Sequence, residues 1–178
     1  GGASGLGKAM AEEAARRGMK VVIADVEAGA MEQAVTDLRA NGAEAIGVLT
    51  DVTSAASVEA LAVTTEESFG PANLLFNNAG VASGGPIWES TEKDWKWLFG
   101  VNVDGVANGV RSFTPRMLAA AAADAAYQGC IVNTASMAGL VTAPGMGIYS
   151  VSKHAVLALS ECLYHDLDLV GDQVKTAV

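Results

Sequence analysis

The sequence is poor in cysteine, proline, basic side chains and long apolar runs. It has 178 residues with 2 cysteines and 4 prolines, and a net charge of −9. Two cysteines cannot build a disulfide scaffold, so Cys130 and Cys162 are expected to be reduced, buried thiols in a cytoplasmic protein. The acidic balance repels phosphate backbones, so no nucleic acid partner is expected. The longest apolar run, 118–123, is too short to span a bilayer, and no membrane partner is expected.

What the sequence does contain is a series of short apolar runs that alternate with helical patterns. Hydrophobic residues make up 51% of the chain and 20 residues are glycine. This composition suits one domain over 1–178. The alternation predicts an α/β fold, a doubly wound, Rossmann-like parallel sheet with helices on both faces. The expected helices are 8–17, 28–40, 54–69, 92–118 and 149–170, and the expected strands are 21–24, 45–50, 74–76, 130–133 and 175–178. The Ala-rich stretch 119–128 is either a helix tail or a surface loop.

A glycine-rich segment opens the chain. Gly1, Gly5 and Gly7 form a Gly-x-x-x-Gly-x-Gly pattern before a predicted helix. Small residues there let backbone N–H groups approach a pyrophosphate, and the helix N-terminus adds partial positive charge. The same glycines would also serve a plain tight turn between a strand and a helix.

Two acidic residues stand where predicted strands end. Asp25 lies 18 residues after Gly7, close to the offset of the carboxylate that binds an adenosine ribose hydroxyl. A carboxylate there repels a 2′-phosphate, which favours NAD over NADP, although Asp25 could instead cap a turn. Asp51 could accept a hydrogen bond from the adenine amino group, or simply precede a helix that Thr53 or Ser54 caps.

Four polar residues in the second half form a candidate catalytic set. Tyr149 and Lys153 lie four residues apart, on one face of a predicted helix. An ammonium near a phenol lowers the pKa of the tyrosine and suits it to acid–base catalysis, although exposed Tyr–Lys pairs are also common. Ser136 lies 13 residues before Tyr149, just after a strand. Asn102 is an amide in an apolar helix that could equally bond its own backbone.

Together these motifs resemble the short-chain dehydrogenase/reductase family, in its one-domain subgroup. The glycine pattern, Asn77–Asn78–Ala79–Gly80, Asn102, Ser136 and Tyr149-x-x-x-Lys153 occur in the family's order, and the resemblance covers essentially the whole chain. It implies an NAD-dependent dehydrogenase or reductase acting on a neutral, mostly apolar secondary alcohol or ketone, and a homodimer or homotetramer. The alternative is a catalytically silent NAD-binding protein on the same fold.

The resemblance also implies residue roles. Tyr149 would exchange a proton with the substrate oxygen, Lys153 would hold the nicotinamide ribose, Ser136 would polarise the carbonyl, and Asn102 would hold a water linking Lys153 to solvent. The residues expected at the cofactor are Gly1, Ser4, Gly5, Leu6, Gly7, Asp25, Asp51, Val52, Asn78, Ala79, Gly80, Tyr149 and Lys153. The residues expected to line the substrate are Ser136, Met137, Ala138, Met146 and Tyr149. No metal is expected.

The chain also departs from the family pattern. Asn73 stands where the family usually has an aspartate with a structural role. The family has a strand and a threonine before the glycine loop and a substrate lid after the equivalent of Val178, so we expect 1–178 to be part of a longer chain. That first strand is the centre of the family's sheet, and without it the strands at Val21 and Ala45 would lack a partner toward Leu74. His154 is expected to pack on the helix side opposite Lys153, and Trp88, Trp95 and Trp97 to lie in the core or an interface.

Overall fold

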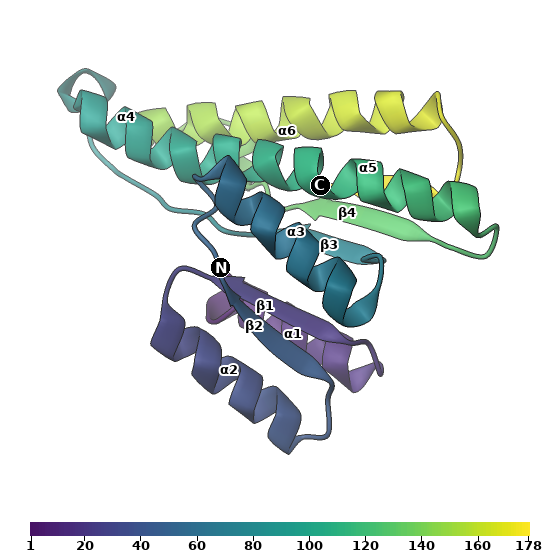
Figure 1. Ribbon diagram of the computed structural model, residues 1–178. Helices are drawn as coiled ribbons and strands as arrows, with labels where there is room; N and C mark the ends of the chain where they lie inside the picture. The colour runs from purple at the N-terminus through teal and green to yellow at the C-terminus, as the bar shows by residue number, and fades with distance from the viewer.

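The computed structural model describes residues 1–178 as parallel strands that alternate with helices (Figure 1). The strands are β1 (Val21–Asp25), β2 (Ala45–Leu49), β3 (Leu74–Asn77), β4 (Gly129–Asn133) and β5 (Val174–Ala177). The α-helices are α1 (Gly5–Arg16), α2 (Ala28–Ala40), α3 (Ala55–Phe69), α4 (Glu92–Phe99), α5 (Gly105–Ala123) and α6 (Gly147–Asp168). Short helical turns lie at Ile87–Glu89 (η1), Gly100–Asp104 (η2) and Met137–Gly139 (η3). The predicted α/β fold is confirmed.

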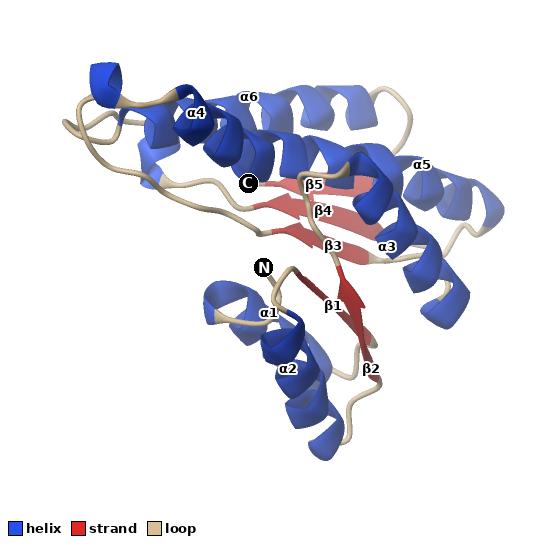
Figure 2. Cartoon of the chain, turned by 60° about the vertical axis from the view of Figure 1, so that its left-hand side comes forward, coloured by secondary structure: helices blue, strands red, loops and turns tan.

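The strands form two separate parallel sheets (Figure 2). In one, β1 pairs with β2, with Val21 opposite Ala45; in the other the order is β3-β4-β5, with Leu74 opposite Cys130. No strand hydrogen bonds join β1 to β3, as predicted from the sequence. A cavity of about 500 Å³ lies between the two sheets. It is lined by strands β1 and β3 and by helices α1, α3 and α5.

Three apolar clusters hold the layers together. Residues of α1 and α2 pack on one face of the β1–β2 sheet around Ile23 and Met31, and α3 packs on the other face through Val58 and Ala62. The third cluster joins α5 and α6 to β4 and β5 around Met117, Ile131 and Leu163. Helices therefore cover both faces of the β1–β2 sheet. Residues 1–178 place helices on one face only of the β3-β4-β5 sheet, and the edge strand residue Phe76 is exposed.

The local signals for helix ends largely match the structure. Ser54 caps α3 by accepting a hydrogen bond from the Ser57 amide, and Thr91 and Asp94 form a capping box at α4. Gly18, after α1, has the left-handed φ of +78° that the sequence predicts. However, α1 begins at Gly5 rather than at residue 8, so the glycine segment supplies its first turn.

The prediction of one continuous helix over 92–118 was wrong. A π-helical turn, η2, separates α4 from α5, and α5 then continues through the Ala-rich stretch to Ala123. Asn102 lies in this turn and its side chain bonds outside the helix, to Val81 and Ser152. These long-range contacts coincide with the irregular turn, which breaks the helix at Asn102.

Several burial predictions need correction. Cys130 and Cys162 are free, as expected, but Cys162 is exposed and Cys130 is only partly buried. Trp88 is 82% exposed and Trp97 is half exposed, which excludes the core for both, and an interface stays a prediction for them. His154 does face away from Lys153, but it is exposed and bonds the Ser150 carbonyl instead of packing. No helix has the length and apolar character needed to cross a membrane.

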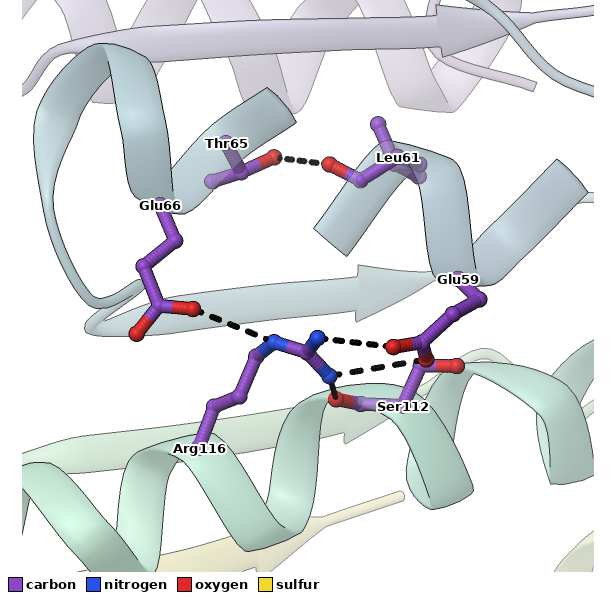
Figure 3. Close-up of polar contacts among 6 residues, drawn as sticks. All are labelled: Glu59, Leu61, Thr65, Glu66, Ser112 and Arg116. Atoms are coloured by element: carbon purple, nitrogen blue, oxygen red, sulfur yellow. Dashed lines mark hydrogen bonds and ion pairs between the residues drawn. The ribbon is translucent and has the colours of Figure 1, made fainter. Parts of the chain in front are cut away.

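Two polar contacts tie neighbouring elements on the surface. Arg116 of α5 bridges Glu59 (2.7 Å) and Glu66 (3.2 Å) of α3, and this raises the pKa of the guanidinium (Figure 3). Asn73 donates its side-chain amide to the Gln128 carbonyl and so joins the segments that enter β3 and β4. A carboxylate could not donate this bond. Asn73 is therefore structural here, through a contact that the family's aspartate could not make.

Candidate active site

The glycine segment forms a backbone cradle at the carboxyl end of β1. The Gly1 nitrogen and the Gly2 amide both donate to the Ala24 carbonyl, and the Gly1 carbonyl accepts from Asn78 Nδ2 at 2.9 Å. A Cβ on Gly7 would lie 1.8 Å from the Gly1 oxygen, so only glycine lets the first turn of α1 fold back onto Gly1.

The first turn of α1 has unpaired donors. Ser4 at the N-cap makes no side-chain capping bond, no acidic residue lies in the first turn, and the amides of Gly5, Leu6 and Gly7 have no acceptor. Gly5 has φ of +52° and open space around it, and Leu6 is exposed. Free amides at a helix N-terminus bind anions, so this cradle fits the pyrophosphate of a dinucleotide.

Asp25 is held beside the cradle. Its Oδ2 accepts from the Ala3 amide at 2.9 Å and its Oδ1 from the Glu27 amide at 3.1 Å. Burial raises the pKa of the Asp25 carboxyl, and the hydrogen bonds from these two amides lower it, so the pKa lies below its usual value. Asp25 is therefore a fixed carboxylate. Its Oδ1 accepts only from the Glu27 amide and keeps a lone pair for a ribose hydroxyl, whereas Oδ2 also lies 3.3 Å from the Gly1 nitrogen.

Asp51 and Val52 lie at the end of β2. Asp51 is exposed, and its Oδ1 accepts from the Thr53 amide and hydroxyl, which leaves Oδ2 without a partner in the chain. The Val52 carbonyl accepts from Asn108 of α5, and a Cβ on Gly105 would lie 2.9 Å from the Val52 side chain. Asp51 thus precedes the helix that Ser54 caps, as one of the two alternatives expected, and its second oxygen remains open.

Tyr149 and Lys153 lie in the first two turns of α6. Lys153 Nζ is 5.8 Å from the centre of the Tyr149 ring, and it donates to the Thr134 carbonyl at 2.8 Å. Lys153 is only 4% exposed, and burial lowers the pKa of its ammonium. The Lys153 side chain therefore lies between the tyrosine and the carboxyl end of β4.

Asn102 joins this pair to the loop after β3. Its Oδ1 accepts from the Val81 amide, and its Nδ2 donates to the Val81 carbonyl and to Ser152 Oγ. Ser152 in turn donates to the Tyr149 carbonyl at 2.7 Å. A Cβ on Gly80 would lie 3.6 Å from both Asn102 Oδ1 and Lys153 Nζ. Both protons of the Asn102 side-chain amide are thus used by the protein, and its Oδ1 accepts one hydrogen bond.

Ser136 lies where β4 leads into η3. Its Oγ accepts from the Ala138 amide at 3.1 Å, which leaves the hydroxyl proton free to donate to a substrate oxygen. A Cβ on Gly139 would lie 2.8 Å from the Lys153 carbonyl, so this turn packs directly on the α6 backbone. The turn therefore places Ser136 beside the helix that carries Tyr149.

The residues predicted to line the substrate border this turn. Met137 is 70% exposed, whereas Ala138 and Met146 are partly buried. Met146 pairs with Gly85 through an isolated bridge, which joins the loop after β3 to the start of α6. Met137 and Ala138 follow Ser136 in the chain and Met146 lies three residues before Tyr149, so these residues form the proposed apolar rim of the site.

The geometry also shows residues that the sequence did not single out. Thr134 provides the acceptor for Lys153, and its Oγ1 donates to Asn78 Oδ1 at 3.3 Å. Ser152 links Asn102 to the tyrosine turn. Ser152 could have been found from the sequence, because it lies inside the Tyr-Ser-Val-Ser-Lys motif. The Thr134 carbonyl could not, because a backbone acceptor leaves no signal in the sequence.

Comparison with known proteins agrees with this arrangement. The model of the family described as short chain dehydrogenase matches residues 1–177. The chain belongs to this family. A solved short-chain dehydrogenase/reductase from Burkholderia phymatum, in complex with NAD, superimposes with a TM-score of 0.95 and 55% identity, over 99% of this chain and 61% of that one.

Two curated relatives of this short-chain dehydrogenase chain are named dehydrogenases. The "CLA biosynthesis dehydrogenase/reductase" of Lactiplantibacillus plantarum is 39% identical over 94% of this chain and 57% of its own length. The "C alpha-dehydrogenase" of Sphingobium sp. is 39% identical over 96% of this chain and 55% of its own length. The chain therefore spans just over half the length of these relatives. The family prediction is confirmed.

Proposed function

We propose that the full protein containing this chain transfers a hydride between NAD(H) and a neutral secondary alcohol or ketone. The observation that carries the proposal is the fixed Tyr149–Lys153 pair, with the buried ammonium bonded to the Thr134 carbonyl at the carboxyl end of β4. When bound, the nicotinamide would supply the hydride acceptor or donor. The protein would supply orientation and proton transfer.

In this proposal each residue acts on a stated atom. The Tyr149 hydroxyl gives or takes the proton of the substrate oxygen, while the Lys153 ammonium stabilises the phenolate and holds the ribose. Ser136 donates its free hydroxyl proton to the same oxygen. Asn102 has a positioning role, because its side-chain amide is hydrogen-bonded to the Val81 backbone and to Ser152 Oγ. A water link from Asn102 to Lys153 would use the second lone pair of Asn102 Oδ1 or the backbone of Asn102.

The test is turnover by the full-length protein, followed at the nicotinamide absorbance with a panel of secondary alcohols and ketones. We expect turnover with apolar, uncharged members, because the rim around Ser136 offers no Arg or Lys to bind an anionic substrate. If the protein binds NADH with micromolar affinity but turns over no member, the silent NAD-binding alternative is favoured.

NAD preference is a separate part of the proposal. We expect Asp25→Asn to narrow the preference for NAD over NADP by roughly tenfold or more, because the variant removes the charge that repels a 2′-phosphate. Asparagine keeps an oxygen for the Ala3 amide but loses the bond from the Glu27 amide, because its Nδ2 is a donor. The measurement is kcat/KM with each cofactor.

The matched control for Asp25 is Glu27→Gln, which removes an exposed negative charge two residues away. We expect its cofactor ratio to equal that of the wild type. If Asp25→Asn leaves the ratio of kcat/KM with NAD to kcat/KM with NADP unchanged, Asp25 does not bind the adenosine ribose.

The assembly and location stay predictions. We propose a homodimer or homotetramer in which α5 and α6 contribute the interface, in a cytoplasmic protein. The exposed apolar residues Val151 and Tyr164 on α6 and Trp97 on α4 support such a contact. Sedimentation analysis of the full-length protein measures the assembly.

A further inference from the structure

A chain of three polar side chains, of which Asn133 and Ser160 are buried, lies beneath the proposed site. Asn77 Nδ2 donates to Asn133 Oδ1 at 2.9 Å, and Asn133 Nδ2 donates to Ser160 Oγ at 3.0 Å. Ser160 Oγ then donates to the Val156 carbonyl at 2.7 Å. The chain joins the ends of β3 and β4 to α6, and none of its members is explained by contact with a cofactor or substrate.

The direction of these bonds is determined by the serine. A hydroxyl has one proton, and the Ser160 proton goes to the Val156 carbonyl. Ser160 can therefore only accept from Asn133, whose amide must turn its oxygen toward Asn77. Asn133 is fully buried and Ser160 is 3% exposed. An unpaired amide here would carry a full desolvation cost, so the three side chains depend on one another.

Neighbouring residues at the end of β4 hold α6 at two points. The Asn133 side chain contacts Ser160, while the carbonyl of the adjacent Thr134 accepts from Lys153. Ser160 and Lys153 are seven residues apart, about two helical turns or roughly 10 Å along the axis. One contact alone would let α6 pivot or slide, whereas two contacts fix both its rotation and its axial position.

We propose that Ser160 and Asn133 are positioning residues for Lys153, because they hold α6 in the register that places the ammonium on the Thr134 carbonyl. The proposal rests on the function proposed above for Lys153. The buried ammonium has only this one hydrogen-bond acceptor in the chain, so a small shift of α6 would leave the charge unpaired. The same shift would move Tyr149, one turn earlier on the helix.

The test is Ser160→Ala in the full-length protein. We expect kcat to fall by about tenfold, since small misplacements of catalytic groups have effects of this order or larger. The KM of the alcohol should change by less than about threefold, and the NADH dissociation constant, from fluorescence titration, should rise about threefold or more.

Ser160→Thr keeps the hydroxyl and should recover most of kcat. Ser160→Cys, a similar-sized side chain with a weak acceptor, should behave like alanine.

The matched control is Thr65→Val. Thr65 of α3 also donates to the carbonyl four residues earlier, that of Leu61 (Figure 3), but it makes no bond to a strand. The control should lower the thermal midpoint as Ser160→Ala does, with kcat and NADH affinity within twofold of the wild type. If Ser160→Ala also lowers only the midpoint, the positioning role is wrong.

Failure of the positioning role of Ser160 can be distinguished from failure of the proposed hydride transfer. If the wild type binds NADH but oxidises no alcohol, the function is wrong. The NADH affinities of Ser160→Ala and Thr65→Val still decide whether Ser160 positions Lys153. An unchanged NADH affinity in Ser160→Ala would then overturn the positioning proposal.

Discussion

Tyr149→Phe is expected to lower kcat of the full-length protein by about 10³-fold, within the range that loss of a general acid or base produces. The variant removes one hydroxyl and keeps the ring, whose centre lies 5.8 Å from Lys153 Nζ. The helix and the Thr134–Lys153 bond are untouched. NADH affinity, measured by fluorescence titration, should therefore stay within about threefold of the wild type.

The control for this prediction is Tyr164→Phe, at an exposed tyrosine of the same helix. We expect it to retain the full rate. A Tyr149→Phe variant that kept more than a tenth of the wild-type kcat would show that the substrate proton is transferred elsewhere. Loss of NADH binding together with kcat would instead point to a disturbed helix.

Gly7→Ala is expected to weaken NADH binding by about 100-fold or more. The added Cβ would lie 1.8 Å from the Gly1 oxygen and 2.9 Å from Asn78 Nδ2, so the loop would have to open. Opening breaks the Asn78–Gly1 bond and turns the free amides of the first α1 turn away from a common centre. Fluorescence titration with NADH gives the affinity, and thermal unfolding gives the effect on stability.

A second glycine provides the comparison for Gly7. Gly29 lies in α2, and a Cβ there meets nothing within 4 Å. Gly29→Ala should keep full NADH affinity and should stabilise α2 slightly, because alanine favours helix over glycine by up to about 1 kcal/mol. Equal NADH affinity in Gly7→Ala and Gly29→Ala would exclude the cradle as the pyrophosphate site.

The sequence predicted most elements because their signals are local. Helix α2 has the predicted bounds, Ala28–Ala40, since Asn41 and Gly42 end it, and β2 differs by one residue. The π-turn at Asn102 was missed because the side-chain contacts of Asn102 are to Val81 and Ser152, which are distant in sequence. Cys162 was misplaced for a similar reason, since an apolar environment in sequence does not tell which helix face meets the sheet.

The candidate site could be predicted in part. Tyr149 and Lys153 are predictable because four residues of helix bring them to one face. The acceptor of Lys153 was not predictable, because a backbone carbonyl carries no residue type. The Asn133–Ser160 contact depends on how far α6 extends past β4, which only the assembled layers determine.

The π-turn at Gly100–Asp104 also sets the phase of the helix pair α4 and α5. One additional residue in a turn offsets everything after it by about 100° relative to a regular helix. Leu98 before the turn and Val106, Phe113 and Met117 after it are all buried with this offset in place. Deleting one residue of the turn would restore ideal helix geometry. It would also rotate the buried face of α5, which carries Val106, Phe113 and Met117, away from the sheet. Helical regularity and a filled core are therefore incompatible at this point of the chain, and the irregular turn is the arrangement that keeps the core.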